Sequence, residues 1–150
     1  QHAGYYDESI FIKVNNTLQD NYSNFASLMK MTFDEGLNYF EDNTIDLLHI
    51  DGLHTYEAII HDFENWLPKM NDKGVIVFHD TQVRRDEFGV WKLWDSISKK
   101  YPSYEFRHGY GLGILLVGSN VEEAAAEPGM NMATIYSQWK KYGINKTDIE

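Results

Sequence analysis

Two short apolar runs decide the fold of this chain: IDLLHID at residues 45–51 and VIVFHD at residues 75–80. Each run has the length of a buried strand, and each ends in an aspartate. Between them, residues 55–67 carry apolar side chains at helical spacing, and a proline follows. A strand, a helix and a strand at this spacing form a βαβ unit, in which the two strands are parallel. Asp51 and Asp80 are therefore expected at the same edge of one sheet.

The alternation of strands and helices continues on both sides of this unit. Upstream, residues 25–31 are a candidate strand, and Thr32 and Glu35 form a capping box for a helix that runs to about Phe40. Downstream, residues 87–101 have an apolar stripe at helical spacing and are predicted to pack on the sheet.

A hairpin is predicted to complete the sheet. Residues 104–108 and 112–117 are extended runs joined by a short glycine-containing loop, and residues 71–74 have the composition of a turn. The predicted fold class is α/β, with a mostly parallel sheet and a C-terminal antiparallel hairpin. The composition then changes, so residues 1–118 are expected to form one domain and residues 119–150 a helical tail or linker.

The composition limits the partners of the chain. Its 150 residues hold 13 Lys and Arg against 23 Asp and Glu, a net charge of −10, which disfavours nucleic acid and anionic membranes. The absence of cysteine excludes disulfides, thiolate zinc sites and cysteine nucleophiles, and suits a reducing cytoplasm. No apolar run approaches the roughly 20 residues that span a bilayer. We therefore expect a cytoplasmic protein that binds neither nucleic acid nor membrane.

Polar residues follow both strands of the βαβ unit. Asp51, Gly52 and His54 come after the first strand, and His79 and Asp80 end the second. Ligands of open α/β sheets bind at these carboxyl ends. Three roles fit: Asp51 and Asp80 as ligands of a hard divalent cation, His54 or His79 as a general base, or hydrogen bonds to a cofactor.

Simpler interpretations compete with each of these roles. Asp51 could cap the following helix, and His49 is expected in the core or behind the site. His61 and Asp62 are expected on the solvated side of their helix. The glycine string at residues 109–113 has no following helix, so a phosphate-binding role is not expected.

Residues 45–57, 62–67 and 74–81 together resemble the class I S-adenosylmethionine-dependent methyltransferases. They are most similar to a bacterial branch with D-G-x-H-x-Y after the fourth strand and H-D after the fifth. The similarity runs from the first residues to about Gly118. It implies a Rossmann-like sheet in the order 3-2-1-4-5-7-6 with the last strand antiparallel, in agreement with the predicted hairpin.

The resemblance also implies a cofactor site for S-adenosylmethionine. Met31, Thr32 and Phe33, at the end of the third strand, would lie beside the adenine. Asp51 and Gly52 would lie beside the methyl donor.

Related metal-dependent O-methyltransferases suggest roles for the remaining residues. Acids at the positions of Asp51 and Asp80 hold a divalent cation such as Mg²⁺ in those enzymes. A basic residue at the position of His54 deprotonates the acceptor hydroxyl. Thr81 stands where those enzymes have Asn or Asp, so His54 or His79 is also a candidate base without a metal.

The family context suggests an acceptor and partners. Members of this branch are often encoded with, or fused to, glycosyltransferases, so the expected reaction is O-methylation of a sugar or another small hydroxyl compound. A homo-oligomer is a further possibility. The glycine-rich loop after the first strand and the acid after the second are not in these 150 residues. We therefore expect an N-terminally truncated methyltransferase domain that binds the cofactor weakly and exposes the edge of its fourth strand.

Two other functions remain open at the level of sequence. The His-Asp pairs at 61–62 and 79–80 suggest a metal-dependent hydrolase, although a strand end is an unusual place for its ligands. A non-catalytic docking module that kept the scaffold is the third hypothesis. A separation of more than about 12 Å among Asp51, His54 and Asp80 would favour the docking module.

Overall fold

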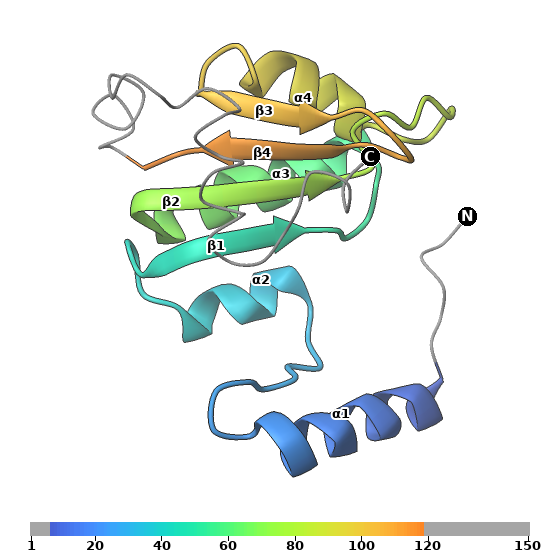
Figure 1. Ribbon diagram of the computed structural model, residues 1–150, viewed down its shortest axis with the longest axis vertical. Helices are drawn as coiled ribbons and strands as arrows, with labels where there is room; N and C mark the ends of the chain where they lie inside the picture. Colours follow the sequence, from blue (N-terminus) through green and yellow to red (C-terminus); the bar gives the residue numbers. More distant parts are fainter. Residues whose placement is uncertain (1–6, 119–150) are drawn as a thin grey trace.

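The computed structural model describes residues 7–118 and shows an α/β fold, as predicted (Figure 1). In chain order its helices, 3₁₀ turns and strands are α1 (Glu8–Tyr22), α2 (Phe33–Gly36), η1 (Leu37–Tyr39), β1 (Ile45–Ile50), α3 (Tyr56–Trp66), η2 (Leu67–Lys69), β2 (Met70–His79), α4 (Val90–Ile97), β3 (Ser103–Phe106) and β4 (Leu112–Leu116). The predicted tail at residues 119–150 lies outside the described residues.

The four strands form one sheet in the order β1-β2-β4-β3. Strands β1 and β2 are parallel, with Ile50 opposite Phe78, and β4 is antiparallel to both β2 and β3. The βαβ unit and the hairpin are therefore confirmed. The order is that of strands four, five, seven and six in the sheet that the resemblance implies.

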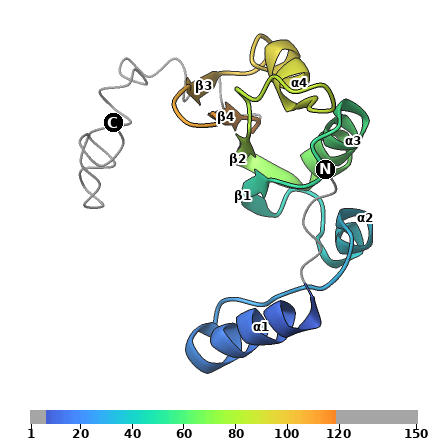
Figure 2. The same cartoon turned by 90° about the vertical axis from the view of Figure 1, so that its right-hand side faces the viewer.

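Helices α3 and α4 cover one face of this sheet (Figure 2). Buried side chains of α3 and α4, among them Ile59, Phe63 and Trp94, pack against Ile76 and Phe78 of β2. Burying a side chain of this size stabilises the fold by about 1.5–3 kcal/mol. This apolar layer holds the helices against β1 and β2, so that both strands end at the same edge of the sheet.

The predicted strand at residues 25–31 is wrong. These residues form a turn and a loop, and no strand precedes β1 within residues 7–118. Phe25 is 76% exposed there, so the apolar run packs on nothing that would order it as a strand. Helix α1 was not expected from the sequence, and it buries no residue.

Three element boundaries also differ from the predictions. Strand β2 begins at Met70 and includes the predicted turn at 71–74, because Met70 pairs with Ile45 across an irregular step in the register. Helix α4 is shorter than predicted, and α2 ends at Gly36 and continues as η1.

Strand β1 is an edge of the described sheet. It pairs with β2 alone among residues 7–118, and Leu47 is 65% exposed. His49 is exposed as well, so its expected place in the core is wrong. The reason is that both side chains point to the face away from α3, which no described helix covers (Figure 2). Within the described part of the chain, no helix is long and apolar enough to cross a membrane.

Candidate active site

Four predicted residues lie together at one edge of the sheet: Asp51, His54, His79 and Asp80, called here the Asp–His cluster. The Nε2 atom of His54 lies 3.3 Å from Oδ1 of Asp51 and 3.0 Å from Oδ2 of Asp80. The Nδ1 atom of His79 lies 3.5 Å from Oδ1 of Asp51 and 3.2 Å from Oδ1 of Asp80. Each imidazole thus faces both carboxylates, and the separation that would have favoured a docking module is not observed.

Local structure leaves Asp51 available for chemistry. Thr55, not Asp51, is the N-cap of α3, and its hydroxyl accepts the N–H of Ala58 at 3.3 Å. The alternative interpretation of Asp51 as a helix cap is therefore wrong.

The backbone at Asp80 is held in an uncommon conformation. Its φ angle is +64°, in the left-handed region that few non-glycine residues adopt. The N–H of Asp80 donates to the carbonyl of Gly111 at 3.0 Å, and the N–H of Gln82 donates to that of Tyr110 at 2.8 Å. The turn between β3 and β4 therefore supports the strained residue through the carbonyls of Tyr110 and Gly111.

Neighbours of His54 fix the position of its ring. The imidazole stacks on Phe88 with centroids 4.8 Å apart and planes 15° from parallel. The N–H of Gly89 donates to the His54 carbonyl at 2.7 Å. Phe88 was not expected at the site from the sequence.

Thr81 does not take part in the cluster. It is fully buried, and its Oγ1 has no hydrogen-bond partner within the described residues. A side chain at Gly111 would lie 2.5 Å from this oxygen, so the hydroxyl points toward the hairpin turn. Thr81 therefore does not replace the Asn or Asp that holds a cation in the metal-dependent relatives.

The cluster offers ligand atoms to a cation without Thr81. One atom each from Asp51, His54 and Asp80 lie within 4.8 Å of one another. Two carboxylates suit Mg²⁺, whereas an imidazole ligand is more typical of Zn²⁺ or Fe²⁺. Within residues 7–118, neither His61 nor Asp62 belongs to such a group, whereas Asp80 of the second His-Asp pair does.

A cavity of about 680 Å³ is lined by residues of α2 and α3 and by Gly52, which follows Asp51 of the cluster in the chain. It is called here the α2–α3 pocket. Four of the five predicted cofactor residues line it, namely Met31, Thr32, Phe33 and Gly52. The fifth, Asp51, belongs to the Asp–His cluster.

Gly52 allows the walls of the α2–α3 pocket to approach each other. A side-chain carbon there would lie 2.8 Å from the ring of Phe33 and 3.5 Å from Oδ2 of Asp62. Phe33 and Leu53, which also line the pocket, keep exposed apolar surface that an aromatic base would cover. The pocket thus offers apolar and aromatic surface beside the buried acid Asp62.

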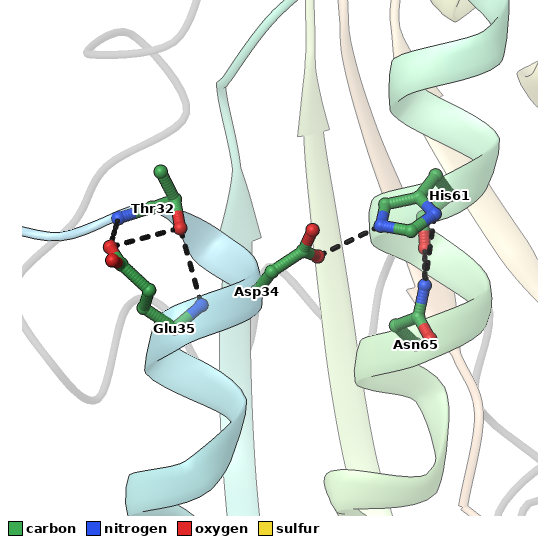
Figure 3. Close-up of polar contacts among 5 residues, drawn as sticks. All are labelled: Thr32, Asp34, Glu35, His61 and Asn65. Atoms are coloured by element: carbon green, nitrogen blue, oxygen red, sulfur yellow. Dashed lines mark hydrogen bonds and ion pairs between the residues drawn. The ribbon is translucent and has the colours of Figure 1, made fainter.

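A hydrogen-bonded pair joins the two helices beside the α2–α3 pocket (Figure 3). Asp34 of α2 lies 2.8 Å from Nε2 of His61 on α3, and the side-chain amide of Asn65 donates to the carbonyl of His61 at 2.8 Å. The hydrogen bond and charge of Asp34 raise the pKa of His61. His61 is exposed, as expected from the sequence, but it is not free.

Asp62 was predicted on the solvated side of α3, and this is wrong. It is buried and lines the α2–α3 pocket, and burial raises the pKa of its carboxyl. The signal was in the sequence: Asp62 lies three residues after Ile59 and four before Trp66, both on the buried stripe.

Comparison with known proteins agrees with this geometry. A family described as a methyltransferase domain matches residues 1–81, which is more than half of the chain. The chain belongs to this family. An uncharacterized protein of Sinorhizobium fredii is 43% identical to the methyltransferase domain over 126 residues, 84% of this chain and 14% of that protein. An uncharacterized protein of Acanthamoeba polyphaga mimivirus is 38% identical over 92 residues, 56% of this chain and 42% of its own length.

Solved structures share the fold of this methyltransferase domain. One is a Staphylococcus aureus protein provisionally named a caffeoyl-CoA O-methyltransferase, with a TM-score of 0.58 and 15% identity over 75% of this chain and 61% of that one. Another is a Corynebacterium glutamicum protein, with a TM-score of 0.55 and 9% identity over 75% of this chain and 57% of that one. The architecture is that of the Rossmann-like class I methyltransferases, and the family implies the use of S-adenosylmethionine.

Proposed function

We propose that this methyltransferase domain takes part in O-methylation of a sugar or another small hydroxyl compound. The observation that supports the proposal is the Asp–His cluster, which stands next to the α2–α3 pocket at the carboxyl ends of β1 and β2. Both regions meet at the dipeptide Asp51-Gly52. S-adenosylmethionine, when bound, supplies an electrophilic methyl group for in-line displacement.

In this proposal His54 is the general base. Its Nε2 faces the carboxylates of Asp51 and Asp80, so the other ring nitrogen, Nδ1, removes the proton of the acceptor hydroxyl, and the two carboxylates stabilise the imidazolium that forms. Stacking on Phe88 orients the ring toward the acceptor. His79 faces the same carboxylates and is the second candidate for this role. Met31, Thr32, Phe33 and Gly52 hold the adenine end of the cofactor.

A divalent cation is the alternative way to activate the hydroxyl. Asp51 and Asp80 would hold it, with His54 as a third ligand, and it would act as a Lewis acid. A chelator separates the two cases. We expect turnover to survive EDTA, because His54 acts as a base in this proposal; loss of activity that Mg²⁺ or Mn²⁺ restores would assign His54 to the metal instead.

Further parts of the proposal concern the whole protein. The domain belongs to the bacterial D-G-x-H-x-Y branch, acts in the cytoplasm and works beside a glycosyltransferase, with residues 119–150 as a tail outside residues 1–118. The chain spans 14% and 42% of the curated relatives that it matches. The 150 residues alone bind S-adenosylmethionine weakly, because they hold no glycine-rich loop that leads from a strand into a helix. Submicromolar binding in calorimetry would contradict this last part.

The direct test compares two histidine variants in the full-length gene product that contains these residues. We expect His54→Ala to lower methyl transfer to hydroxyl acceptors by about 10²–10⁴-fold and to leave cofactor affinity nearly unchanged. His49→Ala is the matched control, because His49 is exposed on β1 and lies outside the Asp–His cluster. Radiolabelled methyl transfer and calorimetry measure the two quantities.

Two results would overturn the proposed role of His54. One is full turnover in His54→Ala, and the other is an equal loss of turnover and cofactor affinity. Transfer to amines but not to hydroxyl compounds would refute the acceptor class.

A further inference from the structure

Asp62 is a buried acid that the proposed chemistry does not use. Its side chain belongs to α3 and lines the α2–α3 pocket, while the residue is only 9% exposed. No hydrogen bond from another side chain or backbone group within residues 7–118 reaches its carboxylate, although His61 and Asp34 act on it through charge. Its oxygens are not among the fully enclosed side-chain atoms that lack a partner in the described part of the chain, so the carboxylate keeps contact with the space of the pocket and can accept a hydrogen bond from a ligand there.

The other polar side chains of the pocket are already engaged. Asp34 contacts His61 across the two helices. Thr32 forms the capping box at the start of α2, and Thr55 caps α3. Glu57, in the first turn of α3, is exposed to solvent and not desolvated. Asp62 is therefore the buried acceptor in this lining that is left for a ligand.

The surroundings of Asp62 indicate what kind of ligand it would meet. A carbon placed on Gly52 would lie 3.5 Å from Oδ2 of Asp62 and 2.8 Å from the ring of Phe33, so the acid and the aromatic ring border the same space. Met31, Leu53 and Ala58 add apolar surface. A flat ring with a hydrogen-bond donor at its rim fits a lining of this kind.

We infer that Asp62 determines base specificity: its carboxylate accepts a hydrogen bond from the 6-amino group of the cofactor's purine. This inference rests on the proposed function and adds a residue that distinguishes one purine base from another. A 6-oxopurine carries a carbonyl oxygen, a hydrogen-bond acceptor, at the same position. This oxygen would face the carboxylate, and the two negatively polarised groups would repel each other. The pocket then rejects the oxo analogue because a desolvated acid is left unpaired.

Binding of adenosine and inosine to the full 150-residue chain tests the inference, since the residues concerned all lie within it. Ligand-observed NMR at millimolar nucleoside measures both affinities even when they are weak. We expect the wild type to prefer adenosine by about tenfold or more, as for a hydrogen bond to a charged group. In Asp62→Asn we expect that preference to disappear or reverse, because the amide donates to the 6-oxo group.

Glu64→Gln is the matched control. It removes the same charge two residues further along α3, where the side chain is exposed and outside the pocket lining. We expect its adenosine preference to equal that of the wild type. Circular dichroism checks that both variants fold. If Asp62→Asn does not fold, purine riboside takes its place: on the wild type, loss of the 6-amino group should weaken binding by about tenfold.

The outcomes separate this inference from the proposed function. Adenosine binding without discrimination against inosine, or discrimination that persists in Asp62→Asn, overturns the role of Asp62 and leaves the proposed function intact. Equal affinity of the wild type for adenosine and purine riboside likewise overturns the role of Asp62 and leaves the proposed function intact. No adenosine binding by the wild type overturns both the role of Asp62 and the proposed adenine site.

Discussion

Two glycines at the site are constrained by different kinds of neighbour. At Gly52 the nearest atom that a side-chain carbon would meet belongs to the ring of Phe33, at 2.8 Å. At Gly89 it belongs to the backbone of Tyr56, at 2.2 Å. A partly exposed ring can rotate away, whereas the first turn of a helix cannot, so the same substitution has different consequences at the two positions.

We expect Gly52→Ala to fold nearly normally but to weaken adenosine binding, because the displaced ring of Phe33 enters the α2–α3 pocket. Its free energy of unfolding should fall by less than about 1 kcal/mol, whereas that of Gly89→Ala should fall by about 3 kcal/mol or more. Urea denaturation and ligand-observed NMR measure these effects. Equal destabilisation by the two substitutions would contradict this account of the neighbours.

At the scale of elements, the α2–α3 pocket depends on a short helix held by few contacts. Helix α2 has four residues, and it buries only Gly36. Its capping box orders the start of the helix, and the Asp34–His61 pair ties it to α3 (Figure 3). Charge on His61 therefore affects how firmly one wall of the pocket is held.

This pair predicts a pH dependence with a definite sign. Asp34 raises the pKa of His61, with smaller contributions from Asp62 and Glu64. The stabilising effect is therefore fully present below the ordinary histidine value of about 6.5 and is lost as pH rises through the raised pKa. We expect NMR titration of the His61 ring to give a pKa above about 6.5, and Asp34→Asn to lower it. An unchanged titration in Asp34→Asn would show that the pair does not form.

At the scale of the whole molecule, one face and one edge of the described sheet remain open. Helices α3 and α4 cover a single face, and β1 pairs with β2 alone among residues 7–118. Leu47 lies on the open face of this edge strand, where Val75 is its neighbour on β2. An apolar edge strand of this kind favours pairing with another chain.

We therefore expect the 150-residue chain to self-associate, and Leu47→Lys to reduce this association by placing a charge on the edge strand. Glu41→Gln is the control, because it changes the net charge by the same amount at an exposed loop position. Sedimentation velocity at several concentrations measures the association. A monomeric wild type, or equal effects of the two substitutions, would contradict the prediction.

Local patterns in the sequence were sufficient to predict the βαβ unit, the hairpin and the capping box at Thr32. They also placed Asp51 and Asp80 at one edge, because parallel strands joined by a helix must end on the same side. These features depend on residues that are close in the chain or linked by a single rule of handedness. The roles of the site residues stay predictions.

Burial, in contrast, was decided by the tertiary structure. Residues 25–31 and His49 have patterns typical of buried strand positions, yet residues 25–31 form no strand, and His49, although paired with Val77 in the sheet, is exposed because no described helix covers its face. Asp62 has a polar side chain that the sequence placed in solvent, yet it is buried beside Gly52 and Phe33. The sequence by itself determined the order of strands and helices from β1 to β4. Only the packing of α2 against α3 decided which side chains meet in the pocket, because burial depends on neighbours distant in the chain.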